Sequence, residues 1–418
     1  MQSIKELYRI GIGPSSSHTM APHKAAQIFC DRHQSDGTNR YEVTLYGSLA
    51  ATGKGHMTDK AIESVLPNVT IHWEPHTFLP YHPNGMRFVA YRDNEQLDDW
   101  LVFSVGGGAL GEDPNSPSAQ RSCSDSGPSA QRSYSDSGPD IYTMTTMTEI
   151  LKYCQYSGKS FWEYVEDIEG KEIWDYLSQV WHTMIACVER GLDAEGVLPG
   201  PLHLRRKANT YYVKASGYKD NVRTRGLVFA YALAVAEENA SGGEIVTAPT
   251  CGSSGVVPGV LYHLWRSREY SETRMLHALA TAALFGNVVK ENASISGADV
   301  GCQGEVGVAC AMAAAAASQL FGGSVAQIEY AAEMGLEHHL GMTCDPVCGM
   351  VQIPCIERNA YAAARALDAN LYASLTDGAH RVSFDRVVEV MKETGHDLPS
   401  LYKETSEGGL ARDFQQMS

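Results

Sequence analysis

The sequence predicts a two-domain fold, an N-terminal α/β (α+β sandwich) domain followed by an all-α domain. Patterns typical of short strands alternate with helical patterns over residues 1–110. A stretch rich in Ser, Gly, Pro and Asp follows at 111–140. From 141 to 418 nearly every apolar pattern has the three-and-four spacing of helices. We therefore expect two domains, 1–110 and 141–418, joined by an insert at 111–140.

The first domain should combine helices with a small sheet. Helical spacing predicts helices over 20–32 and 58–66. Alternation of apolar and polar residues predicts strands over 41–49, 69–73, 86–91 and 100–105. Mixed elements of this size are typical of an α/β sandwich.

The insert contains a tandem repeat, SAQRSCSDSGP at 118–128 and SAQRSYSDSGP at 129–139. Its unit has no apolar face, so it cannot bury enough surface to order itself. Two copies are also too few for a stacked repeat fold. We expect a flexible linker, in which Cys123 is an incidental exposed thiol.

The second domain should be built from helices, with strands nearly absent. Helices are predicted over 162–168, 174–190, 227–238, 272–285, 308–321, 325–336, 356–373 and 384–394. Glycine-rich elbows are expected at 252–259, 296–304 and 341–349.

Composition limits the function classes. The net charge of −16 argues against nucleic acid or an anionic membrane as partner. The longest apolar run, 306–317, is well short of the roughly 20 residues that a membrane span needs. The N-terminus, MQSIKELYRIGIG, lacks the apolar stretch of a secretion signal, so we expect a cytoplasmic protein. Ten cysteines are too few for a disulfide scaffold in 418 residues and favour metal binding or catalysis.

Cysteines concentrate in GMTCDPVCGMVQIPCIERN, residues 341–359. Pro354 precedes a run with helical pattern, so Cys355 should lie at a helix N-terminus, where free N–H groups and the helix dipole favour a thiolate. Cys302 in GADVGCQGEVG should begin an Ala-rich helix in the same way. Thiolates that converge from helix N-termini suit an iron–sulfur cluster.

Six motifs in order resemble those of one family: SIKELYRIGIGPSSSHTMAP, YGSLAATGKGHMTDKA, HPNGMRF, TAPTCGSSGVVPGVL, SISGADVGCQGEVG and GMTCDPVCGMVQIPCIERNA. The chain is similar to the iron–sulfur-dependent bacterial L-serine dehydratases (L-serine ammonia-lyases), in their single-chain form. The resemblance covers nearly everything except the insert and the final residues. It implies conversion of L-serine to pyruvate and ammonia, within serine catabolism and gluconeogenesis, and we expect a homodimer.

The resemblance also implies a [4Fe-4S] cluster held by Cys302, Cys344 and Cys355, with one iron open to the substrate hydroxyl. Such an iron acts as a Lewis acid on a poor leaving group. His56 in GKGHMTDKA matches the family's base, and histidine suits that task because its pKa lies near working pH. Substrate-binding residues should include Ser15, Ser16, Ser17, His18, Thr19, His82 and Asn84.

Other interpretations remain open. Free cysteines commonly pack as small apolar residues, which is the interpretation we favour for Cys30, Cys154, Cys187 and Cys310. His56 could cap a helix or lie at the surface, and His338 and His339 could support the cysteine loop. A pyridoxal phosphate enzyme, with GSSGVVPG as phosphate cradle and Lys54 or Lys290 as Schiff-base lysine, is the alternative enzyme. A non-enzymatic iron–sulfur sensor is the alternative outside enzymes.

The chain departs from the family pattern in its cysteines. Many single-chain relatives end in a cysteine that caps the open iron, whereas this sequence ends ARDFQQMS. Cys251 stands where the family commonly has asparagine, and Cys348 where it commonly has glycine. We expect Cys348 to lie near the cluster without binding the open iron.

Overall fold

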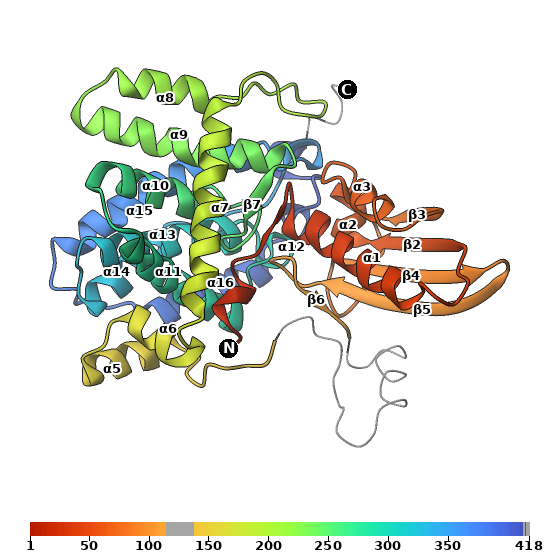
Figure 1. Ribbon diagram of the computed structural model, residues 1–418, viewed down its shortest axis with the longest axis horizontal. Coiled ribbons are helices and arrows are strands. Elements are labelled where there is room, and N and C mark those ends of the chain that lie inside the picture. The colour runs from red at the N-terminus through yellow and green to blue at the C-terminus, as the bar shows by residue number, and fades with distance from the viewer. Residues whose placement is uncertain (114–137, 413, 415–418) are drawn as a thin grey trace.

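The structure, a computed structural model, describes residues 1–113, 138–412 and 414. A mixed sheet with its helices stands beside a large helical body, as Figure 1 shows, which confirms the predicted fold class. The tandem repeat and Cys123 lie outside the described residues, apart from the last residues of the second copy. The proposed domain limits at 110 and 140 stay a prediction.

Five strands form the sheet, in the order β3-β2-β4-β5-β6. Strand β2 is parallel to β3, and the other neighbours are antiparallel. In β2 alternate residues are buried, so one face packs on helix α1 around Phe29, Phe88 and Trp100. The elements are α1 (Ala21–Arg32), β2 (Arg40–Tyr46), α2 (Gly47–Thr52), α3 (Thr58–Glu63), β3 (Val69–Glu74), β4 (Gly85–Arg92), β5 (Glu95–Ser104) and β6 (Leu110–Gly111).

Two of the four predicted strands have ends that differ from the structure by more than one residue. The strand predicted over 41–49 stops at Tyr46, because Gly47 has a φ of +53° and starts helix α2. The strand predicted over 100–105 begins earlier, at Glu95, where polar residues pair with β4 at the rim of the sheet. Helix α2 therefore begins directly at the end of β2, and the turn after it carries His56.

The helical body is organised around α13, whose Ala-rich sequence is almost entirely buried. Helices α10, α11, α14 and α15 pack against it. The helices are α5 (Met147–Ser157), α6 (Phe161–Glu169), α7 (Ile173–Asp193), α8 (Ala208–Ser216), α9 (Asp220–Ala240), α10 (Val256–Arg268), α11 (Glu272–Asn292), α12 (Gly297–Val300), α13 (Val308–Leu320), α14 (Val325–Glu337), α15 (Cys355–Ser374) and α16 (Phe384–Asp397). Within the described ranges, no helix has both the length and the apolar character needed to cross a bilayer.

Helices α5, α8, α10 and the short α12 of the helical body were not predicted. Helix α10 begins at Val256, inside the segment 252–259 that we expected to be an elbow. Pro258 falls in the first turn, where a proline is tolerated. Gly259 is needed for packing, because a Cβ there would lie 2.9 Å from the Cα of Ala232 in α9. The glycine that suggested a loop thus permits a close helix crossing.

The N-terminal segment ties the two parts of the molecule together. Ile4, Leu7 and Tyr8 are buried in the core of the helical body. Strand β1 (Ile10–Ile12) then pairs antiparallel with β7 (Glu244–Val246), seen in Figure 1 as the red strand beside the green one. The chain passes from this pair directly into residues 15–19 and helix α1, so the 15–19 segment is held between sheet and helices.

The ion pair between His380 and Glu329 in the helical body should make the free energy of unfolding depend on pH. His380 Nε2 lies 2.9 Å from Glu329 Oε2, and its ring stacks on Tyr330. The hydrogen bond to Glu329 raises the pKa of His380 to about 9. Because the folded-state pKa lies above the ordinary value of about 6.5, the stabilisation is complete below pH 6.5 and is lost as pH rises through 9.

We expect the His380–Glu329 pair to contribute roughly 1 kcal/mol to the free energy of unfolding at pH 6, after allowance for screening by solvent, and nothing at pH 10. Chemical unfolding at the two pH values measures this contribution. The variant His380→Asn should lack that pH-dependent part. His182→Asn removes an exposed histidine 3.8 Å from Glu272 and should change little at either pH. If the free energy of unfolding depends on pH in the same way in wild type and in His380→Asn, the pair makes no such contribution.

Candidate active site at the three-cysteine cavity

A small enclosed cavity lies where the N-terminal part meets the helical body. It has about 10 Å³ of space for the centre of a water molecule, which is room for roughly one water. Residues from both ends of the chain line it: Ser15, His56, Gly252, Cys302, Glu305, Cys344, Pro346, Val351, Cys355 and Glu404. The three cysteines that the resemblance singled out therefore share one cavity with His56.

A different local structural feature fixes the position of each cysteine. Cys302 is the residue directly before a π-helical turn, Gln303–Gly307, that leads into α13. Cys355 is the first residue of α15, after Pro354, so its predicted place at a helix N-terminus is confirmed. The C-terminal segment holds Cys344: its N–H donates to the Tyr402 carbonyl at 2.8 Å.

The electrostatics of the cavity oppose thiolates in the metal-free chain. Burial raises the pKa of Cys302 to about 11 and raises those of Cys344 and Cys355 well above the ordinary value. Negative charge on Glu305 adds to the effect at all three. The expectation from the helix N-terminus alone, a favoured thiolate at Cys355, is thus outweighed by burial and by its neighbours. A positively charged occupant would reverse this balance.

Three thiols that line one cavity are ligands of the kind that an iron–sulfur cluster uses. Among the described residues, no three His, Cys, Asp or Glu side chains are placed to hold one metal ion. A cluster binds each cysteine at a separate iron, so its ligands surround a larger body. Gly297 keeps this wall open, since a Cβ there would lie 3.1 Å from Cys344 Sγ and 2.6 Å from Glu305 Oε2.

His56 is a buried histidine with one free nitrogen, not the surface residue of the alternative interpretation. Its Nδ1 lies 3.0 Å from the Thr52 carbonyl, an acceptor, so Nδ1 carries the proton. Nε2 is buried and has no hydrogen-bond partner within the described part of the chain. Burial lowers the pKa of His56 to about 4, below the near-neutral value that the sequence led us to expect. The ring is therefore neutral near pH 7, with a free lone pair on Nε2.

Residues 15–19 support His56 and each other. Thr19 Oγ1 donates to the His56 carbonyl at 2.7 Å, and the rings of His18 and His56 lie 4.5 Å apart. Ser15 Oγ accepts the His18 N–H at 3.1 Å, so Ser15 both caps the π-helical turn Ser16–Met20 and lines the cavity.

Four other predicted substrate residues do not line the cavity: Ser16, Ser17, His82 and Asn84. Ser16 and Ser17 are buried, and Ser17 Oγ lies 3.1 Å from His18 Nδ1. His82 Nδ1 accepts the Asn84 N–H at 3.1 Å, and neither residue lines the cavity. The Asn84 side chain is fully buried, and neither of its amide atoms has a partner in the described residues.

Two acidic residues were missed by the sequence analysis. Glu305 follows Cys302 in the motif GCQGEVG, and its Oε1 accepts the Thr250 hydroxyl at 2.7 Å. An acid inside a cysteine motif was a signal that could have been noticed. Glu404 lies in a segment without periodicity, YKETSEGG, and is 6% exposed. Burial, followed by the charge of Glu305, raises its pKa well above the ordinary value.

The other thiols and the candidate lysines lie outside the cavity. Cys348 occupies a tight turn, Val347–Gly349, with a φ of +56°, and Cys251 Sγ contacts Met20 Sδ at 3.4 Å. Lys54 is exposed over the Trp73 ring, and Lys290 donates to Gln2 Oε1 at 2.9 Å. Neither lysine of the pyridoxal alternative faces the three cysteines.

Cys310, Cys154 and Cys187 are buried in helices, as a packing role requires, while Cys30 is partly buried. His339 is buried and its Nδ1 lies 2.7 Å from the Gly335 carbonyl, whereas His338 is exposed. Neither histidine lines the cavity.

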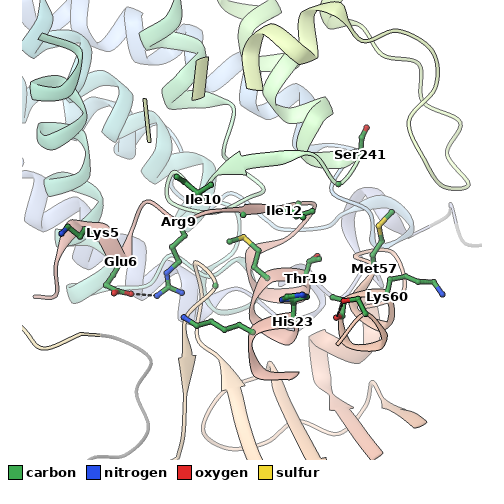
Figure 2. A pocket seen from close by; sticks show the side chains of 18 of the residues that line it. Lys5, Glu6, Arg9, Ile10, Ile12, Thr19, His23, Met57, Lys60 and Ser241 are labelled. Atoms are coloured by element: carbon green, nitrogen blue, oxygen red, sulfur yellow. Dashed lines mark hydrogen bonds and ion pairs between the residues drawn. The ribbon is translucent and has the colours of Figure 1, made fainter. Parts of the chain in front are cut away.

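A larger groove of about 1050 Å³ lies between β1, α1 and α3, and Thr19 is one of the residues that line it. Figure 2 shows Ile10 and Ile12 on one side of it and Lys60 and His23 on the other. The two cavities are separated by the segment that carries Thr19, and no cysteine lines the groove. Of the predicted site residues, Ser15, His56 and the three cysteines line the smaller cavity, whereas Thr19 lines the groove.

Comparisons with known proteins agree with these motifs. The model of the serine dehydratase alpha chain matches residues 90–411, and that of the serine dehydratase beta chain matches residues 3–70. L-serine dehydratase 1 of Escherichia coli is 40% identical over 99% of this chain and 100% of its own length. L-serine dehydratases of Streptomyces coelicolor (40% identical; 98% of both chains) and Helicobacter pylori (36%; 99% of both) are also similar. The chain therefore belongs to the serine dehydratase family.

Proposed function

We propose that this protein is an L-serine ammonia-lyase that converts L-serine to pyruvate and ammonia with a [4Fe-4S] cluster held by Cys302, Cys344 and Cys355. The observation that carries the proposal is that these three thiols and the free Nε2 of His56 line one cavity. The relatives' names support the reaction, and the donor set supports the cofactor. When bound, such a cluster supplies an iron with an open position that activates a hydroxyl leaving group.

His56 removes the Cα proton of the substrate in this proposal. The Thr52 carbonyl fixes the proton on Nδ1, so Nε2 is the nitrogen available as base. Once Nε2 has accepted the proton, the same carbonyl stabilises the imidazolium through the Nδ1–H. The elimination gives aminoacrylate and water, and hydrolysis of its imine form releases ammonia.

Residues 15–19 orient the substrate. Ser15 reaches the cavity itself, and Thr19 fixes the backbone of His56. Ser16, Ser17, His18, His82 and Asn84 complete the proposed substrate-binding set, and the unpartnered amide of Asn84 supports its inclusion. The cavity has room for roughly one water, so in this proposal its walls lie further apart when the cluster and serine are bound.

An anaerobic assay tests this function. Protein purified without oxygen should form pyruvate and ammonia in equal amounts from L-serine, and lose this activity in air. The pyridoxal alternative instead predicts activity that survives air and is blocked by borohydride reduction. A sensor would bind serine and keep its iron but form no pyruvate, which would overturn the proposal.

A further inference from the structure

The C-terminal segment places a carboxyl group in the cavity. After α16 the chain runs past Cys344, and Glu404 N–H donates to the Cys344 carbonyl at 2.7 Å. The Glu404 carbonyl accepts the Ser48 hydroxyl at 2.9 Å. Its φ of +57° is uncommon for a residue other than glycine and is held here by bonds on both sides. The backbone therefore fixes the direction of this side chain.

Glu404 faces two histidine nitrogens that are both acceptors. Its Oε1 lies 3.5 Å from His18 Nδ1 and 3.9 Å from His56 Nε2. Ser48 donates its proton to the Glu404 carbonyl, so the nearby His18 Nε2, 3.2 Å from Ser48 Oγ, must be the donor in that pair. That leaves the lone pair of His18 on Nδ1, just as the lone pair of His56 is on Nε2.

Within the part of the chain that the structure describes, two of the acceptors around this space lack a donor, whereas His18 Nδ1 lies 3.1 Å from the Ser17 hydroxyl, which can donate to it. In the described residues, neither Glu404 Oε2 nor His56 Nε2 has a partner, although both are buried. Leaving buried acceptors unpaired is unfavourable, so these two atoms need a donor, either the proton of the Glu404 carboxyl itself or a donor of a bound ligand. A primary ammonium group has three donors and a charge that complements a carboxylate.

We infer that Glu404 is the residue that binds the α-ammonium group of the substrate. The inference rests on the proposed function, because it makes the substrate an α-amino acid. An ammonium at Glu404 puts the substrate Cα one bond away, beside His56 Nε2. The same carboxylate distinguishes amino acids from acids without the amine, since a site built for an N–H rejects an analogue that lacks it.

Glu305, the other acid of the cavity, is less suited to this role. Its Oε1 accepts the Thr250 hydroxyl at 2.7 Å. Its Oε2 lies 3.8 Å from Cys344 Sγ, a proposed cluster ligand that can donate to it only while it is a thiol. Glu305 is thus already bound to Thr250 beside a proposed cluster ligand, whereas Glu404 has an oxygen without a partner in the described residues and lies 3.5 and 3.9 Å from the two histidines.

The test uses two non-reactive analogues as competitors of serine turnover. L-Alanine keeps the ammonium and lacks the leaving group, and propanoate lacks both. Wild-type protein should bind alanine at least about 30-fold more tightly than propanoate. Glu404→Gln should weaken alanine binding and raise KM for serine about 10- to 100-fold, and leave propanoate binding unchanged. Glu404→Asp should fall between these two proteins, because it keeps the charge.

Glu407→Gln is the matched control, since Glu407 is exposed on the same segment. An equal loss of alanine and propanoate binding in Glu404→Gln would overturn the inference, as would a lower kcat with unchanged alanine binding. Calorimetric titration of both analogues needs no turnover. If wild type forms no pyruvate, the proposed function fails, while a selective loss of alanine binding in Glu404→Gln still supports the ammonium site.

Discussion

Replacement of Cys344 by alanine should abolish both iron binding and serine turnover, with activity falling more than about 1,000-fold. Cys344 is buried in the cavity with Cys302 and Cys355, so its loss removes one of three thiol ligands. Backbone bonds to the C-terminal segment hold this position and persist in the variant. The measurements are iron content, visible absorbance and pyruvate formation, all without oxygen.

Cys310→Ala is the matched control for this loss. Cys310 is also completely buried, but it lies within α13 and away from the cavity. Its replacement should lower the thermal midpoint slightly, because a small cavity is left, and should keep iron and turnover. A Cys344→Ala protein that retains iron and activity would show that Cys344 is not a ligand.

Replacement of His56 by alanine should lower kcat about 100- to 10,000-fold and leave the cluster absorbance unchanged. The reason is that Nε2 is the unpaired acceptor that faces the cavity, and no thiol depends on the ring. Added imidazole should restore part of the activity, because the variant leaves a ring-sized hole beside Thr52.

His72→Ala provides the comparison, since His72 is exposed on β3. It should match wild type in kcat, KM and absorbance. A His56→Ala protein with kcat within a few fold of wild type would remove His56 from its proposed role as base. Loss of iron in this variant would instead assign it a structural role.

Local patterns predicted the positions of the site residues that lie next to helix ends. Pro354 marked the start of α15 and hence the place of Cys355. The glycine-flanked His56 was expected just before a helix, and α3 begins at Thr58. These signals act over a few residues, so a sequence pattern can reveal them.

Features that depend on distant segments could not be predicted in this way. Glu404 lies in an irregular segment and reaches the cavity only because that segment pairs with Cys344. Strand β1 has three residues, too few for alternation to be visible, and it exists because β7 lies beside it. The raised pKa of Cys355 likewise results from burial among other acidic groups, which a helix end alone does not reveal.

The central claim is that three cysteines hold an iron–sulfur cluster on which serine dehydration depends. Iron and acid-labile sulfide, determined on anaerobically purified wild-type protein, test it most directly. We expect about four of each per chain, lost together with activity on exposure to air. Pyruvate formation from serine by protein that contains neither iron nor sulfide would contradict the account.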